Sequence, residues 1–230
     1  MHDNAIARIR ELFGHARDPR TEMRLVQEAT KIEGSESVFR RIVKANSVDE
    51  VLDCTTEIRY ALAFDNRLFK VKFMLPGAEA KPDLLVSRGD DSAYVEIRRI
   101  RPDQRSLPVS SADVLPQYGG EVDLRKIEQE LRGKFRQVLA VSGSNSIIAT
   151  WSDRDFVEEV DFEQAVRNIR RSPTDPVDGR PIPGNLLFCI FGWSWTDCGT
   201  GQQLYCEPLR RLTEPFITWM EELEQVRIAF

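Results

Sequence analysis

The stretch KPDLLVSRGDDSAYVEIRRI, residues 81–100, decides the fold that we expect. Residues 82–87 and 93–100 are mainly apolar, and the turn-forming residues Arg-Gly-Asp-Asp at 88–91 separate them. A further segment, LFKVKFM at 68–74, alternates apolar with basic side chains, as a half-buried strand does. The three segments together predict an antiparallel meander.

The segments around this meander predict helices and two more strands. Residues 3–45 carry apolar side chains at helical spacing, with a break within 14–19. Ser47 is a good N-cap, and Glu50 three residues on completes a capping-box pattern, which predicts a helix to about Phe64. Beyond the meander we expect helices at 121–140, at 153–171 and from about 214, and strands at 146–151 and 186–195. This order predicts an α/β (α+β) sandwich with a mixed central sheet flanked by helices.

The chain length indicates one large domain with a helical appendage in preference to two equal domains. We expect an N-terminal helical segment, residues 1–46, and then one domain, residues 47–230, with its core at 47–152. Residues 102–120 contain three prolines and a Gly-Gly pair, which predict a long loop. Loops of that length in compact domains are typically functional or mobile.

Composition limits the classes of partner. The net charge of -5 argues against a surface coated with basic side chains, although basic residues cluster at 98–101, 132–136 and 167–171. No apolar run approaches the roughly 20 residues of a membrane span, and the N-terminus lacks the features of a secretory signal. We therefore expect a cytoplasmic protein with no membrane partner. The four cysteines form no CxxC pair, which predicts reduced, mostly buried thiols and no zinc-ligand spacing.

Candidate metal ligands come from the meander. Side chains alternate along a strand, so Glu96 and Arg98 should project together, and the hairpin should bring Asp83 close to them. The two carboxylates and the backbone carbonyl of Ile97 would form an oxygen-rich site suited to Mg²⁺ or Mn²⁺. Such an ion polarises a phosphoryl oxygen and activates water, as phosphodiester hydrolysis requires. The plain alternatives are that Asp83 is a strand-start or turn residue, and that Glu96 pairs with Arg98 or Arg99 on a solvated face.

These residues, in this order, resemble the PD-(D/E)XK nuclease superfamily, whose common core is a helix, a meander, a helix and a strand. Pro82-Asp83 and Glu96-Ile97-Arg98 match the two parts of the motif, and the resemblance covers residues 47–152. It implies a restriction-endonuclease-like sandwich with Asp83 and Glu96 as metal ligands. Glu57, on the preceding helix, would assist behind these ligands or at a second metal ion.

Glu57 lies nearly opposite the main apolar stripe of its own helix. However, Tyr60, Ala61 and Phe64 follow it at i+3, i+4 and i+7, which predicts a second buried face. A carboxylate on a buried face requires a metal ion or a cationic partner.

Arg98 stands where the family has lysine. Arginine is bulkier and lacks a compact ammonium group, so the exchange is not conservative. Three outcomes are open: Arg98 works at a reduced rate, another lysine replaces it, or catalysis is lost and binding is kept. Lys134 is the best substitute, because it flanks the apolar stripe of the downstream helix and lies in KFRQ, which resembles the family's basic, Gln-bearing helix. Lys81, two residues before Asp83, is the other candidate.

The sequence therefore favours a metal-dependent nuclease that acts on DNA or, as a second choice, RNA. In this reading Asp83, Glu96 and Ile97 hold Mg²⁺ or Mn²⁺, Glu57 assists, and Arg98 or Lys134 supplies the positive charge. The alternatives are an inactive nucleic-acid-binding or assembly module on the same fold, and an unrelated α/β interaction module with an accidental motif. A homodimer is one arrangement that the sequence allows.

Overall fold

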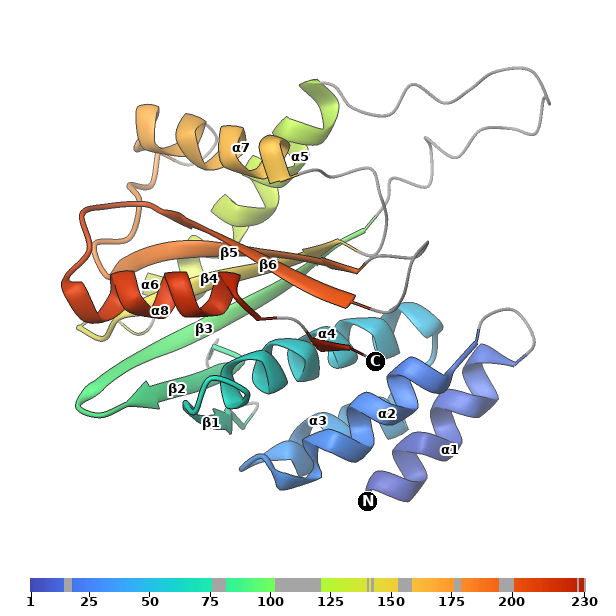
Figure 1. Ribbon diagram of the computed structural model, residues 1–230. Helices are drawn as coiled ribbons and strands as arrows, with labels where there is room; N and C mark the ends of the chain where they lie inside the picture. The colour runs from blue at the N-terminus through green and yellow to red at the C-terminus, as the bar shows by residue number, and fades with distance from the viewer. Residues whose placement is uncertain are drawn as a thin grey trace, which may run out of the picture.

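The computed structural model describes residues 1–14, 18–75, 82–101, 121–139, 141, 143–152, 159–175, 179–194, 201–226 and 228–229 (Figure 1). N-terminal helices precede a mixed β-sheet that carries helices on both faces. The α/β class and the mixed sheet expected from the sequence are thus confirmed.

The described strands form one sheet in which spatial order follows chain order. They are β1 (Lys70–Phe73), β2 (Leu84–Arg88), β3 (Asp91–Ile100), β4 (Ser146–Ser152), β5 (Leu186–Ser194), β6 (Gly201–Pro208) and β7 (Ile228–Ala229). Strands β1 to β3 form the predicted antiparallel meander, β3 to β5 run parallel, and β6 and β7 are antiparallel to their neighbours. The long β3 therefore belongs both to the meander and to the parallel part of the sheet.

The helices form layers on the two faces of the sheet (Figure 1). They are α1 (His2–Phe13), α2 (Arg20–Glu28), α3 (Ser35–Lys44), α4 (Val48–Asp65), α5 (Glu121–Gly133), α6 (Phe135–Leu139), α7 (Glu159–Arg171) and α8 (Glu214–Glu224), with a 3₁₀ turn at Ala29–Lys31. Helices α5 to α7 share a buried cluster on one face, and α4 and α8 share the core of the other. Helices α1 to α3 pack on the outer side of α4 and belong to that second core.

Helix α4 begins at the predicted cap. The Ser47 Oγ accepts a hydrogen bond from the Glu50 N–H at 3.2 Å, and the Glu50 carboxylate accepts one from the Asn46 N–H at 2.7 Å. Every residue from Cys54 to Phe64 is buried, because the sheet covers one side of the helix and α1 to α3 cover the other. The second buried face expected for this helix is confirmed.

The N-terminal region differs from the prediction by one additional break. The sequence predicted a break only within residues 14–19, whereas a 3₁₀ turn and Gly34 also separate α2 from α3. Gly34 has a φ of 79°, and a Cβ atom there would lie 2.6 Å from the Phe73 carbonyl oxygen. A glycine is needed because α3 begins directly against the end of β1.

The helix expected at 121–140 is divided. Helix α5 ends at Gly133 and α6 begins at Phe135, so Lys134 lies at the junction. Strand β6 was missed, although the alternation of buried Leu204 and Cys206 with half-buried Gln203 and Tyr205 is a strand signal.

Some residues for which the sequence made predictions lie outside the described ranges. Helix α7 covers only the second part of the helix predicted at 153–171, and residues 153–158 and 102–120 lie outside the described ranges. Cys54, Cys189 and Cys206 are buried free thiols, as expected, and Cys198 also lies outside these ranges. In the part of the chain that the structure describes, no helix is long and apolar enough to cross a membrane.

Candidate active site

Asp83 lies where β2 begins and its pairing with β3 stops. The first paired residues are Leu84 and Val95, and the Asp83 N–H donates to the Val95 carbonyl at 3.0 Å. The Asp83 Oδ2 accepts a hydrogen bond from the Ile97 N–H at 2.8 Å. The carboxylate is thus fixed beside the part of β3 that carries Glu96. Asp83 is a strand-start residue, as the plain alternative held, but its side chain is also held against β3.

Glu96 pairs with Lys134. The Glu96 side chain is 1% exposed, and its Oε1 accepts a hydrogen bond from the Lys134 Nζ, whose side chain is 16% exposed. The alternative of a solvated strand face for Glu96 is therefore wrong, because burial on the α5 side of the sheet removes this carboxylate from water. The lysine singled out by its position on the helical wheel does contact the glutamate of the motif.

Arg98 is held by a different carboxylate. Its Nε donates to the Glu130 Oε2 at 2.6 Å. Two residues along a strand span about 6.6 Å and four along a helix about 6 Å, so Glu96 and Arg98 match Lys134 and Glu130 in spacing. The result is two ion pairs of opposite polarity between β3 and the α5 to α6 segment. Arg98 was expected to project together with Glu96, and in the structure its guanidinium contacts Glu130.

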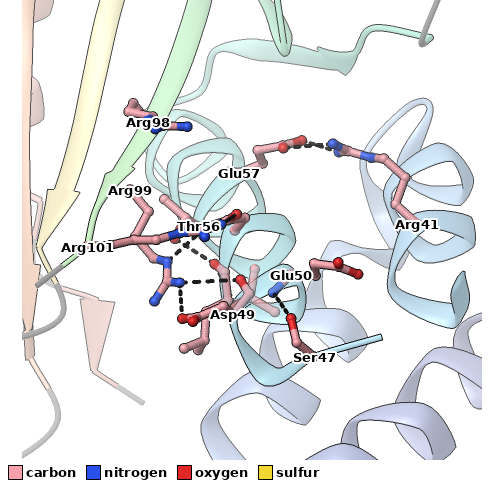
Figure 2. A network of polar contacts seen from close by, with 12 residues as sticks. Arg41, Ser47, Asp49, Glu50, Thr56, Glu57, Arg98, Arg99 and Arg101 are labelled. Carbon is pink, nitrogen blue, oxygen red and sulfur yellow. Dashed lines mark hydrogen bonds and ion pairs between the residues drawn. The ribbon is translucent and has the colours of Figure 1, made fainter. Parts of the chain in front are cut away.

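Glu57 is paired with a residue from the N-terminal helices. The Arg41 Nη1 donates to the Glu57 Oε1 at 2.9 Å, and the Nη2 donates to the Oε2 (Figure 2). The Glu57 side chain is 10% exposed, whereas that of Arg41 is 39% exposed. Sequence reasoning missed Arg41, because it lies in an ordinary basic helix face with no motif. Glu130 was missed because it lies on a charged helix face with no motif.

The site residues are electrostatically coupled. Burial raises the pKa of Glu57 to about 7, with a further contribution from the Asp83 charge, and the hydrogen bonds from Arg41 oppose the rise. Burial likewise raises the pKa of Glu96 to about 8, again assisted by Asp83 and opposed by Lys134. The pKa of Asp83 itself is raised by burial, against the Ile97 hydrogen bond and the charges of Lys134 and Arg41. Three carboxylates and two cations therefore share one region around the end of the β2–β3 pairing.

One buried oxygen of the site lacks a partner. The Glu96 Oε2 is buried without a hydrogen bond, and such orphaned acceptors are costly unless a ligand or water completes them. Carboxylate oxygens from Glu96 and Asp83 are the donor type that Mg²⁺ and Mn²⁺ prefer, so these residues fit such an ion. Among the described side chains no group of three or more histidine, cysteine, aspartate or glutamate residues could hold a metal ion. A metal here would be held by the two carboxylates together with backbone, water or substrate oxygens.

Arg99 faces the opposite side of the sheet. Its Nε donates to the Asp53 Oδ1 at 2.9 Å, and its Nη2 also contacts the Asp49 carboxylate (Figure 2). Both aspartates lie on the first two turns of α4, so the pairs join β3 to that helix. The alternative in which Glu96 pairs with Arg99 is thereby excluded. Lys81, the second candidate lysine, lies outside the described residues.

No protein-family model, curated protein or solved structure matches the chain. The geometry described above is thus the basis for a functional conclusion.

Proposed function

We propose that the protein is a divalent-metal-dependent nuclease that hydrolyses phosphodiester bonds of DNA or RNA, on a restriction-endonuclease-like fold. The observation that carries the proposal is the contact between Lys134 and Glu96 next to the anchored carboxylate of Asp83. This contact supports the proposal because it puts a lysine beside Glu96, although position 98, where the motif has lysine, is arginine in this chain. The order of α4, the meander, α5 and β4 supports the same reading, because it matches the family's common core.

Each residue of the proposed site has a distinct task. Asp83 and Glu96 would hold Mg²⁺ or Mn²⁺, which would polarise a phosphoryl oxygen and lower the pKa of a bound water. The Ile97 N–H orients the Asp83 carboxylate, and Lys134 orients Glu96. Because backbone and ion-pair contacts fix both carboxylates before substrate arrives, little reorganisation is needed during the reaction.

Lys134 can do more than orient Glu96. An ammonium group has three donors, and one is used on the Glu96 Oε1. The others are free to hold the attacking water and a phosphate oxygen on which negative charge develops. Hydrolysis forms a bond between the water oxygen and phosphorus and breaks the bond between phosphorus and the sugar oxygen. The attacking water releases a proton to solvent, and the leaving sugar oxygen takes one from solvent. Lys134 stabilises the charge on phosphate during this exchange, and Arg98, held by Glu130, does not take part.

Cleavage of nucleic acid tests this proposal. The wild type should cut single- or double-stranded DNA, or RNA, in the presence of Mg²⁺ or Mn²⁺ and not in the presence of a chelator. Asp83→Asn and Lys134→Ala should each lower the rate at least about 100-fold, as removal of one electrostatic group from a site commonly does. Lys126→Ala is the matched control, since Lys126 lies on α5 and contacts the Arg101 carbonyl, away from Glu96.

The outcomes are separable. If Lys134→Ala cuts as fast as the wild type, Lys134 is not the working cation. If the wild type cuts none of the substrates and Arg98→Lys alone restores cutting, the chain is a retired nuclease that has kept the fold as a binding module.

A further inference from the structure

We infer that the site takes a single divalent ion, because Arg41 of α3 already pairs with Glu57, the carboxylate that would bind a second ion. The inference rests on the proposed nuclease function and deepens it. It also assigns to the N-terminal helices a positioning residue at the site, in addition to their packing against α4.

Arg41 contacts both carboxylate oxygens of Glu57. Arg41 donates to both oxygens in a fork-to-fork arrangement, which is among the strongest side-chain pairings in proteins (Figure 2). A guanidinium does not lose its proton in proteins, so the pair does not open by deprotonation of Arg41. A metal ion that bound Glu57 through its remaining lone pairs would lie beside this fixed positive charge, which disfavours an ion there while Arg41 is in place.

The surroundings of Arg41 also disfavour a second cation. The Arg41 Nε is buried and has no hydrogen-bond partner, so an unpaired donor lies close to Glu57. Such a donor attracts an anionic oxygen, such as that of a phosphate, and repels a metal ion. The Arg41 side chain as a whole is 39% exposed, which leaves room for substrate to approach it.

The charges lead to the same count of ions. When ionised, the carboxylates of Glu57, Asp83 and Glu96 with the cations Arg41 and Lys134 leave one net negative charge. One divalent ion converts this to one positive charge, which balances the single charge of a phosphodiester. Two divalent ions would leave three positive charges in a partly buried site, which is unfavourable before substrate binds.

Counting bound Mn²⁺ tests the inference directly. Bound ions per chain are measured from the loss of the free Mn²⁺ signal in electron paramagnetic resonance, with wild type, Arg41→Gln, Glu57→Gln and the Arg41→Gln/Glu57→Gln double variant. We expect one ion for the wild type, two for Arg41→Gln, which frees Glu57, and one for the double variant. A circular-dichroism melt of each variant establishes that it is folded.

If Arg41→Gln does not fold, Glu57→Gln still tests the inference. Glutamine at position 57 keeps a hydrogen bond to Arg41 but carries no charge for a metal ion. If Glu57 is not a ligand, this variant binds one ion with an affinity within about fivefold of wild type. Two ions on the wild type, one ion on folded Arg41→Gln, or loss of an ion in Glu57→Gln would overturn the inference. Absence of Mn²⁺ binding in the wild type would instead overturn the nuclease proposal, and this inference with it.

Discussion

Replacement of Lys134 by methionine removes the ammonium group that Glu96 contacts and keeps most of the apolar stem. Glu96 is 1% exposed, so wherever Glu96 is ionised the variant leaves an uncompensated carboxylate in the interior of the metal-free protein. Removal of one partner from a buried ion pair typically costs about 3–5 kcal/mol of folding free energy. Glu96 can avoid part of this cost by binding a proton, which makes the penalty depend on pH.

The sign of that dependence follows from the pKa of Glu96. Burial raises it from 4.5 to about 8 in the folded wild type, and Lys134 opposes the rise. Without Lys134 the pKa is higher still. Above pH 8 the folded variant therefore keeps a proton that the folded wild type and both unfolded chains release. Proton retention by the folded state alone lowers stability by about 1.4 kcal/mol per pH unit, so the penalty should grow by about 2 kcal/mol between pH 8 and 9.5.

Urea unfolding of metal-free protein, followed by circular dichroism at several pH values between 7 and 9.5, measures this penalty. Lys126→Met, on α5 and away from Glu96, is the control and should not show the growth in penalty expected of Lys134→Met. The double variant Glu96→Gln/Lys134→Met should lose the pH dependence. A Lys134→Met penalty that stays constant between pH 8 and 9.5 would refute the buried pair.

Three further predictions concern the other residues of the site. Arg98→Ala should lower the free energy of unfolding by less than about 1 kcal/mol, because Arg98 contacts Glu130 in a partly exposed pair. The rate of metal-dependent cleavage should stay within about threefold of wild type, and a loss of about 100-fold in rate would contradict this. Mn²⁺ at 100 times its Kd should stabilise the folded wild type by about 2.7 kcal/mol, measured by thermal unfolding. Asp83→Asn should abolish this stabilisation. An equal rise in melting temperature in both proteins would mean that the ion binds elsewhere. The Mn²⁺ affinity measured by calorimetry should rise about tenfold per pH unit between pH 6 and 8. The reason is that the ion must displace the proton that burial keeps on Glu96. An affinity independent of pH would exclude the Glu96 carboxylate as a ligand.

Local patterns were sufficient to predict most of the fold. The Ser47 cap, the hairpin turn at 88–91 and the alternation of residues 68–74 each arise from a few neighbouring residues, so they could be identified without tertiary information. The break at Gly34 could not, because that glycine is required by a close approach to Phe73, which lies far along the chain. Strand β6 is a different case, since its alternating pattern is present in the sequence and was overlooked.

The candidate site was predictable only where side-chain direction follows from periodicity. The helical wheel placed Lys134 at the flank of the apolar stripe, which agrees with its contact to Glu96. Strand alternation correctly placed Glu96 and Arg98 on one face of the sheet. It could not show that Arg98 pairs with Glu130, because that contact depends on how α5 packs on β3. The role of Arg41 could not be predicted from the sequence, because its pairing with Glu57 depends on how α3 packs against α4.

A crystal structure of the protein soaked in Mn²⁺, with the anomalous signal of the ion recorded, tests the central claim most directly. The account predicts one ion bonded to a carboxylate oxygen of Asp83 and one of Glu96 at about 2.0–2.6 Å, with the Lys134 ammonium still in contact with Glu96. An ion bound elsewhere, or Asp83 and Glu96 carboxylates more than about 8 Å apart, too far for one ion with such bonds to bridge, would contradict it.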